Sequence, residues 1–246
     1  MSFKEGDWVL LVYEDKRYLR KLDRNFSLNV GKQVVKFEDI EGRRAGEEVK
    51  GFYLLEPTLE DIILLGFKRK TQIVYPKDSF YVAFKLGLSK EKKLLEFGVG
   101  SGASTAVFSQ LAGEVWVYEV REDFYHLAMK NWERFNLCGN VKISLQDFSE
   151  AQVEENFFDC AFVDVKEPER FVEKVWKALK PGGVLASILP TTNQVVSMLR
   201  ATQELFCAHE VVETLHRSYK TNPERLRPQD LMIGHTGYLF FARKRI

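Results

Sequence analysis

The sequence lacks any hydrophobic run long enough to cross a membrane. A transmembrane helix needs about 20 consecutive apolar residues, and no segment of this 246-residue chain comes close to that length. The first residues, with Lys4 and Glu5, also lack the apolar core of a signal peptide. Hydrophobic residues make up 45% of the chain and charged residues 29%, as in ordinary globular proteins. We therefore expect a cytoplasmic protein that is not attached to a membrane.

Cysteine and histidine are too few and too scattered for a disulfide framework or a metal centre. Cys138, Cys160 and Cys207 lie far apart and form no C-x-x-C pair. The four histidines show no ligand spacing such as H-E-x-x-H. We expect no metal, and we interpret Cys160, within the apolar run 158–163, as a core residue.

The chain also lacks the excess of positive charge that many nucleic-acid-binding proteins carry. Lys and Arg number 36 against 35 Asp and Glu. A polyanionic partner would have to bind at local patches, of which the sequence offers two. One is Lys68-Arg69-Lys70, and the other is the segment 217–227, which holds four basic residues. Charge alone favours a solvated surface for both.

Short runs of β-branched and aromatic residues fill the first part of the chain. They cover residues 8–13, 18–22 and 33–37, with polar turn residues between them. Pro57 and Thr58 then break the pattern, and Thr58 can cap a short helix that follows. The pattern predicts a small all-β domain over residues 1–60, a barrel or sandwich of about five strands, and a second domain over residues 61–246.

The second domain shows a regular alternation of strand and helix patterns. Apolar strand patterns cover residues 93–97, 115–118, 141–145, 158–163, 184–189 and 237–242, and helical periodicity marks residues 103–111, 124–135 and 171–179. Such alternation is typical of an α/β fold with a doubly wound, mostly parallel sheet.

A glycine-rich turn follows the first of these strands and opens a helix. Glycines let a backbone approach a ligand closely, and a helix start offers unpaired N–H groups. Nicotinamide, flavin and methyl-donor enzymes all use such a turn, and a tight turn without a ligand is the plainer alternative. The candidate cofactor-binding residues are Gly98, Gly100, Ser101, Gly102 and Ala103.

Two acids at later strand ends make the cofactor site more specific. Glu119 ends the second strand about 20 residues after the glycines, where an acid can bind both hydroxyls of a ribose. Asp147 follows the third strand and can accept a hydrogen bond from an exocyclic amine, while the adjacent Phe148 can stack on a purine. Each acid alone could be a surface charge, but their order at strand ends argues for a site. The spacing G-x-G-x-G favours S-adenosylmethionine over a dinucleotide.

These features together resemble the class I S-adenosylmethionine-dependent methyltransferases. The resemblance rests on the run 96–102, the acids at 119 and 147, and Leu179-Lys180-Pro181-Gly182-Gly183. It covers residues 90–245 and implies a Rossmann-like sheet of seven strands whose last strand is antiparallel.

A closer resemblance is to the tRNA (adenine-58-N1)-methyltransferases. The segments that carry it are Gln72-Ile73-Val74-Tyr75-Pro76-Lys77-Asp78, Asp164 after the fourth strand, Leu189-Pro190 with Gln194, Arg227-Pro228, and 234–239 with 242–244. The resemblance implies methylation of N1 of an adenine in the T-loop of tRNA by a homotetramer.

The same resemblance assigns residues to the target site. Asp164 would be catalytic and would also border the cofactor, and Tyr75 would be catalytic through contact with the target base. Gln72, Tyr75, Gln194 and His235 are candidate substrate-binding residues, although structural packing is the plainer interpretation of His235. Because N1 of adenine already carries a lone pair, the reaction needs positioning and electrostatic stabilisation more than a strong base.

The sequence departs from that family after Asp164. The family commonly shows D-x-P-x-P-W, whereas this chain has Lys166 in place of the first proline and Glu169 in place of the tryptophan. Two alternatives therefore stay open: a methyltransferase with another RNA target, and a non-catalytic tRNA-binding subunit of a methyltransferase complex. The complete donor motif argues against the second alternative.

Overall fold

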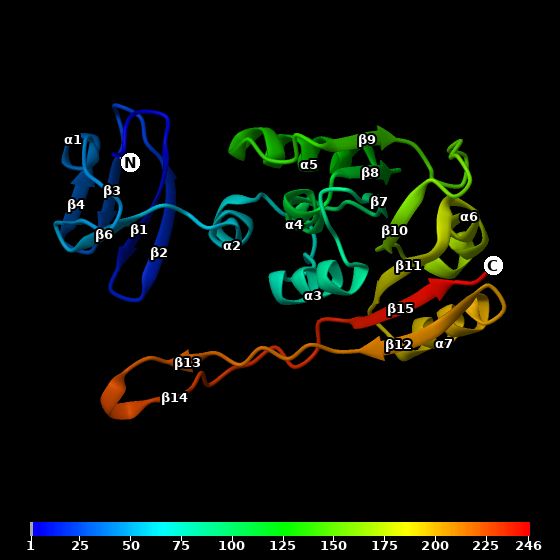
Figure 1. The fold of residues 1–246 in the computed structure, drawn as a ribbon. Coiled ribbons are helices and arrows are strands. Elements are labelled where there is room, and N and C mark those ends of the chain that lie inside the picture. Colours follow the sequence, from blue (N-terminus) through cyan, green and yellow to red (C-terminus); the bar gives the residue numbers. More distant parts are fainter. Residues whose placement is uncertain (1) are drawn as a thin grey trace. The chain divides into compact units, whose positions relative to one another are not determined.

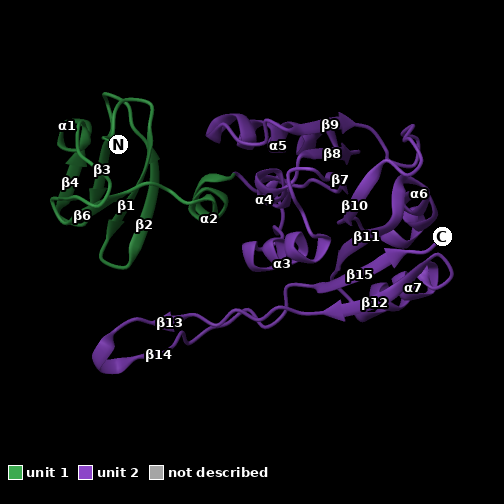
Figure 2. Ribbon diagram, viewed as in Figure 1, with its two compact units in different colours: residues 1–67 green, residues 68–246 purple. Residues whose placement is uncertain are grey.

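The computed structural model describes residues 2–246 of the chain. The protein divides into two compact units, of which the first ends at Phe67 and the second spans Lys68–Ile246 (Figure 2). Within the described residues, no helix is long and apolar enough to cross a membrane.

Unit 1 is built on two small antiparallel sheets. The sequence pattern predicts one barrel or sandwich of about five strands, but the strands form a four-stranded sheet, in the order β2-β1-β6-β5, and a separate β3-β4 hairpin. Alternating apolar residues of both sheets, Leu11 and Phe52 among them, share one core. The strands are β1 (Trp8–Tyr13), β2 (Lys16–Lys21), β3 (Ser27–Val30), β4 (Gln33–Lys36), β5 (Glu48–Val49) and β6 (Phe52–Leu55), with the short helix α1 (Phe37–Ile40) after β4.

Unit 1 ends in a short helical segment that begins where the sequence predicts. The Thr58 side chain accepts a hydrogen bond from the N–H of Asp61, and Asp61 accepts one from the N–H of Thr58, which makes a capping box. Helix α2 (Leu59–Asp61) then continues as the π-helical turn η1 (Ile62–Gly66).

Unit 2 contains a seven-stranded sheet in the order β12-β15-β11-β10-β7-β8-β9 (Figure 1). Strands β11, β10, β7, β8 and β9 run parallel, and β15 is antiparallel to both of its neighbours, as the resemblance implies. The fold is therefore the expected Rossmann-like methyltransferase fold. The strands are β7 (Lys93–Phe97), β8 (Glu114–Glu119), β9 (Val141–Leu145), β10 (Phe158–Val163), β11 (Leu179–Leu189), β12 (Phe206–Val212) and β15 (Tyr238–Lys244).

Helices cover both faces of this sheet. The Phe108 ring of α4 contacts Phe162, and Tyr81 of α3 contacts Phe241, so α3 and α4 lie on one face. The buried residues of α6 and α7, such as Val175 and Met198, belong to a core built on the alternate side chains of the same strands. The helices of unit 2 are α3 (Pro76–Leu86), α4 (Ala103–Leu111), α5 (Glu122–Phe135), α6 (Val172–Ala178) and α7 (Thr192–Thr202).

An extended arm leaves the sheet between β12 and β15 (Figure 1). We define the arm as residues 213–236. It contains the short antiparallel pair β13 (Tyr219–Lys220) and β14 (Arg227–Pro228), joined by the 3-10 turn η3 (Pro223–Arg225). Four large apolar side chains of the arm are more than half exposed: Leu215, Leu226, Leu231 and Ile233.

Candidate active site

The predicted cofactor and target residues follow neighbouring strands at one edge of the sheet. Gly98 follows β7, Glu119 ends β8, and Asp164 follows β10. Chain order reverses between β7 and β10, because β8 and β9 lie on one side of β7 while β10 and β11 lie on the other. Ligands of open α/β sheets bind at such a switch point, beyond the carboxyl ends of the strands.

At two of the three glycines in the turn, Gly98 and Gly102, a side chain would collide with neighbouring residues. The third, Gly100, has open space beside it. A Cβ atom at Gly98 would lie 1.9 Å from the backbone oxygen of Asp164, and one at Gly102 would lie 2.3 Å from the indole nitrogen of Trp132. A Cβ at Gly100 would meet no protein atom within 4 Å. The turn therefore packs tightly against β10 and α5 while its middle leaves room for a ligand.

The turn ends at the start of α4, which offers unpaired donors. Gly102 is the N-cap residue in a left-handed conformation and Ala103 is the first helical residue, and no side chain caps the first turn. Two side chains of helix α5 donate hydrogen bonds to carbonyl groups of this turn. The Asn131 side chain donates to the carbonyl of Ser101 at 2.9 Å, and the Trp132 indole donates to the carbonyl of Gly102 at 3.0 Å.

Glu119 is almost fully buried and its carboxylate faces the turn. Its Oε2 accepts the N–H of Val99 at 3.1 Å, and its Oε1 accepts the N–H of Arg121 at 2.9 Å. Each carboxylate oxygen can accept a further hydrogen bond. The side chain is thus fixed in place and still able to accept two hydroxyl donors, as a ribose requires.

A cavity of about 210 Å³ lies beside Glu119. Gly98, Asp147 and Phe148 also border it. The Asp147 carboxylate accepts the N–H of Ser149 at 2.7 Å, and hydrogen bonds to Ser149 lower the pKa of Asp147, so this side chain is an ionised acceptor. The ring of Phe148 stacks on Phe97 with a centroid distance of 4.6 Å, the Lys174 ammonium lies 5.0 Å from its centroid, and the side chain is 2% exposed, so the predicted stacking of Phe148 on a purine finds no free ring face.

Sequence reasoning missed most of the other residues that border the cavity. They lie at the ends of β7, β8 and β9 or in the segment after β10, next to the residues that the motifs did identify. These residues are Phe97, Tyr118, Val120, Gln146, Val165, Lys166, Glu167, Arg170 and Phe171.

Asp164 is half-buried at the end of β10, and its acidity is strongly perturbed. Burial, with a further contribution from the negative charge of Glu119, raises the pKa of Asp164 to about 7. Burial likewise raises the pKa of Glu96 to about 7, although the Ser104 hydroxyl donates to this carboxyl at 2.7 Å. A cluster of acids with raised pKa values at a ligand-binding edge is typical of a functional site.

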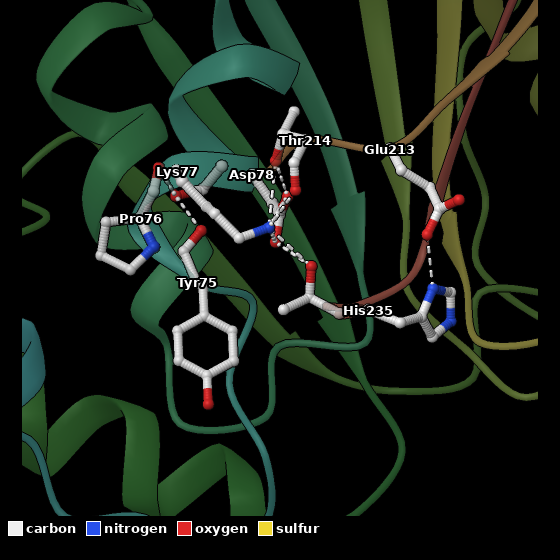
Figure 3. A network of polar contacts seen from close by, with 9 residues as sticks. Tyr75, Pro76, Lys77, Asp78, Glu213, Thr214 and His235 are labelled. Carbon is white, nitrogen blue, oxygen red and sulfur yellow. Dashed lines mark hydrogen bonds and ion pairs between the residues drawn. The ribbon is translucent and has the colours of Figure 1, made fainter. Parts of the chain in front are cut away.

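Tyr75 and Gln72 lie together ahead of helix α3. The Gln72 amide donates to the Tyr75 hydroxyl at 2.7 Å. Pro76 occupies the first position of α3, where its fixed φ suits a helix start, and Tyr75 is the N-cap residue. Figure 3 shows the Tyr75 ring pointing away from the polar cluster of Lys77 and Asp78.

Gln194 and His235 are both engaged in contacts within the protein. Gln194 completes a capping box with Thr191 at the start of α7, and its amide donates to the carbonyl of Lys166 at 2.9 Å. His235 contacts Glu213 at 2.7 Å and the carbonyl of Pro190 at 3.1 Å, and hydrogen bonds to these two groups raise the pKa of His235. Their direct contact with substrate stays a prediction.

The residues present fit S-adenosylmethionine. The open space at Gly100, the remaining acceptor capacity of Glu119 and the ionised acceptor Asp147 match a ligand that carries a ribose and an exocyclic amine. Among residues 2–246, no group of three or more His, Cys, Asp and Glu side chains is placed to hold a metal ion.

Solved structures with similar folds cover almost the whole chain. A crystal structure from Aquifex aeolicus, described as the tRNA (m1A58) methyltransferase TrmI, is 54% identical and superposes with a TM-score of 0.96 over 99% of both chains. A crystal structure from Thermotoga maritima, described as a SAM-dependent O-methyltransferase, is 40% identical with a TM-score of 0.92 and covers 100% of this chain and 95% of that one.

Sequence relatives and a family model agree with the first of these structures. The tRNA (adenine(57)-N(1)/adenine(58)-N(1))-methyltransferase TrmI of Methanocaldococcus jannaschii is 32% identical over 96% of this chain and 94% of its own length. The model of the family described as tRNA methyltransferase complex GCD14 subunit matches residues 50–233. Since that match spans well over half of the chain and agrees with the fold and the strand-end acids, the chain belongs to this family of tRNA methyltransferases.

Proposed function

We propose that the protein transfers the methyl group of S-adenosylmethionine to N1 of an adenine in tRNA, at position 58 of the T-loop. The observation that carries the proposal is the position of Asp164. Its half-buried carboxyl follows β10, beside the buried Glu119 of β8 and the glycine-rich turn after β7. A carboxylate at this point can reach both a bound donor and a base presented to it.

Bound S-adenosylmethionine would supply an electrophilic methyl group on a positively charged sulfur. Glu119 would accept the ribose hydroxyls and Asp147 the adenine amino group of the cofactor. The N–H groups at the start of α4, from Ala103 onward, and the backbone of Gly98, Gly100, Ser101 and Gly102 would line the remainder of the site. Phe148 borders the cavity but is only 2% exposed, so it would support the adenine pocket from the core side instead of offering a free ring face to the cofactor.

Asp164 would act on the target base. Its carboxylate would accept a hydrogen bond from the amino group of the target adenine and stabilise the positive charge that methylation at N1 places on the ring. Tyr75 would pack against the base after extrusion from the T-loop, and Gln72 would fix the Tyr75 hydroxyl. In-line placement of N1 would provide much of the rate enhancement.

Gln194 and His235 would serve the target site through the segments they hold. Gln194 binds the Lys166 carbonyl in the loop after Asp164, and His235 binds the Pro190 carbonyl beyond the end of β11. Both contacts support a substrate-binding surface at the carboxyl edge of the sheet.

The same proposal extends to assembly and location. Exposed apolar side chains on the arm, such as Leu231 at 91% exposure, support a homo-oligomer, and the family resemblance favours four subunits. The proposal includes a cytoplasmic location, because tRNA is available in the cytoplasm.

A second candidate function is O-methylation of an RNA. The similar structure from Thermotoga maritima is described as an O-methyltransferase, and the loop after Asp164 carries Lys166 and Glu167 at the edge of the cavity. A lysine and a glutamate there would change the surface that meets the acceptor.

Nucleoside analysis separates these candidates. We would incubate unmodified tRNA with the protein and S-adenosylmethionine, digest the RNA, and identify the methylated nucleoside by mass spectrometry. The proposal predicts 1-methyladenosine. A 2′-O-methylated nucleoside would favour the second candidate, and donor binding without any methylated nucleoside would indicate a non-catalytic subunit.

A further inference from the structure

An ion pair in the first turn of helix α3 lies at the centre of a polar cluster that includes the base of the arm (Figure 3). The Lys77 ammonium donates to the two carboxylate oxygens of Asp78 at 2.7 and 2.9 Å. The side chain of Asp78 is 0% exposed and that of Lys77 is 17% exposed. Both residues belong to the first turn of α3, which begins at Pro76.

Two threonines from the opposite ends of the arm complete this cluster. Lys77 donates to the Thr236 hydroxyl at 2.7 Å, and also to the hydroxyl and the carbonyl of Thr214. The Thr236 hydroxyl donates to Asp78 at 2.7 Å, and the Thr214 hydroxyl donates to the other oxygen of Asp78. The three N–H groups of the Lys77 ammonium are shared among five acceptors within reach, while each threonine hydroxyl donates to Asp78.

The stability of the fold is not a sufficient reason for this cluster. A buried ion pair is often no more stabilising than apolar side chains of the same volume, because both charges lose their hydration. What such a pair does provide is a directional requirement, since it is satisfied only when all its partners are in place. Here the partners come from α3, from the segment that leaves β12 and from the segment that enters β15.

The cluster lies two residues from Tyr75. The carbonyl of Tyr75 accepts the N–H groups of Asp78 at 2.9 Å and Ser79 at 3.0 Å, so the backbone of Tyr75 is fixed by the first turn of α3. The far end of α3 has its own link to the sheet, an ion pair between Lys85 and Glu210 of β12. The helix would therefore stay docked without the cluster, while its first turn would lose its anchor.

The polar contacts that join the arm to the rest of unit 2 lie close to this cluster. Among the described residues, the polar contacts of residues 215–234 run within the arm, for example those of Lys220 and Arg227 with Asp230. The ties to the sheet and to α3 are at its two ends, where Thr214 and Thr236 join the cluster and His235 contacts the Pro190 carbonyl.

We propose that Lys77, Asp78, Thr214 and Thr236 are positioning residues that lock the base of the arm to the first turn of α3 and thereby hold Tyr75 in place for the target base. The function of the lock rests on the proposed function, because it assumes that Tyr75 meets the adenine. The lock couples the arm to the target site: a ligand that holds the arm also holds the segment that carries Tyr75.

Thr236→Val tests the lock with a change that keeps the shape of the side chain and removes its hydroxyl. We expect the single-turnover rate of tRNA methylation to fall on the order of 10-fold to 10²-fold, which is the rate loss expected when a substrate-positioning group is displaced. Thr236→Ser restores the hydroxyl and should return the rate to within about threefold of the wild type. Thr214→Val should reproduce the loss, and Thr221→Val, the same change elsewhere in the arm, serves as the control.

Combination with Tyr75→Ala distinguishes positioning from a general loss of structure. If the lock acts through Tyr75, Thr236→Val should lower the rate of the Tyr75→Ala protein by less than about threefold, since interacting residues give non-additive effects. An equal loss in both backgrounds would overturn the proposal, as would an unchanged rate in Thr236→Val and Thr214→Val.

Amide hydrogen exchange gives a readout that does not depend on activity. We expect faster exchange at the N–H groups of Asp78 and Ser79 in Thr236→Val, with the exchange of β10 and β11 unchanged. Unchanged exchange at both amides would overturn the lock. A wild-type protein that does not methylate tRNA would instead refute the proposed function, and the exchange result would then decide whether the lock itself exists.

Discussion

Asp164 combines its position at a strand end with a pKa close to neutrality. Burial and the charge of Glu119 raise this pKa above its usual value, to about 7. The proposed role needs the carboxylate, which is the minor form below pH 7. Methylation should therefore be fastest above pH 7 and should fall about tenfold per pH unit as the pH decreases below that value. Single-turnover rates between pH 5.5 and 8.5 would measure this.

Asp164→Asn provides the matched variant. It keeps the size of the side chain but cannot carry the charge, so its rate should be about 10²–10³-fold lower than that of the wild type at pH 8. It should also lose the pH dependence near 7. Near-normal turnover in this variant would remove Asp164 from the reaction.

Glu119 tests the donor site independently of the target. Glu119→Ala removes a buried carboxylate that can accept ribose hydroxyls, and charged hydrogen bonds of this kind contribute about 1.5–3 kcal/mol. We expect calorimetric titration to show weaker S-adenosylmethionine binding by that amount. The N–H groups of Val99 and Arg121 lose their acceptor in the free and in the bound variant alike, so that loss lowers the stability of the fold and not the affinity. Glu122→Ala, at an exposed site on α5, should bind normally, and normal binding by Glu119→Ala would show that the donor lies elsewhere.

At the scale of elements, the first turn of helix α7 contributes to the stability of the fold and also contacts the loop after Asp164. The Thr191 side chain accepts the N–H of Gln194 and begins the helix. Thr191→Ala should lower the free energy of unfolding by about 1 kcal/mol, which is typical for the loss of a helix cap. Gln194→Glu keeps an acceptor for the Thr191 N–H but cannot donate to Lys166. We expect it to reduce the methylation rate more than Thr191→Ala does, and the reverse order would contradict a loop-holding role for Gln194.

The alternation of strands and helices in unit 2 was readable from the sequence because most strands of the sheet are buried on both faces, and the edge strand β9 alternates apolar with polar residues. Six of the strand patterns, such as Phe158–Val163, are short and apolar. Strand β12 gave no such signal, since it lies at the edge of the sheet and carries the polar residues His209 and Glu210. The arm gave none either, because its paired strands are only two residues long.

The strand-end acids could be predicted for a related reason. Glu119 and Asp164 each close a buried strand, and parallel strands bring their carboxyl ends to one edge. The lock between α3 and the arm could not be predicted. Asp78 meets Thr214 and Thr236 across separations of 136 and 158 residues, and no local pattern reports a contact of that range. The motif that contains Lys77 and Asp78 indicated the family but not the reason for these two residues.

At the scale of the whole molecule, we expect the protein to assemble. The exposed apolar side chains of the arm, Leu215, Leu226 and Leu231, would be costly to leave in water. Light scattering at micromolar concentration should give a mass near four times the 28.6 kDa of one chain. A mass near 28.6 kDa itself would contradict the assembly.

Site-specific mapping of the methyl group tests the central claim most directly. An unmodified tRNA transcript and a matched transcript with guanine in place of adenine 58 would each be incubated with the protein and S-adenosylmethionine, and the modified position would be located by mass spectrometry of nuclease fragments. We predict 1-methyladenosine at position 58 of the first transcript, no methylated nucleoside at position 58 of the second, and a large loss of the modification with Asp164→Asn. Methylation of a ribose oxygen, or methylation that ignores the change at position 58, would contradict the account.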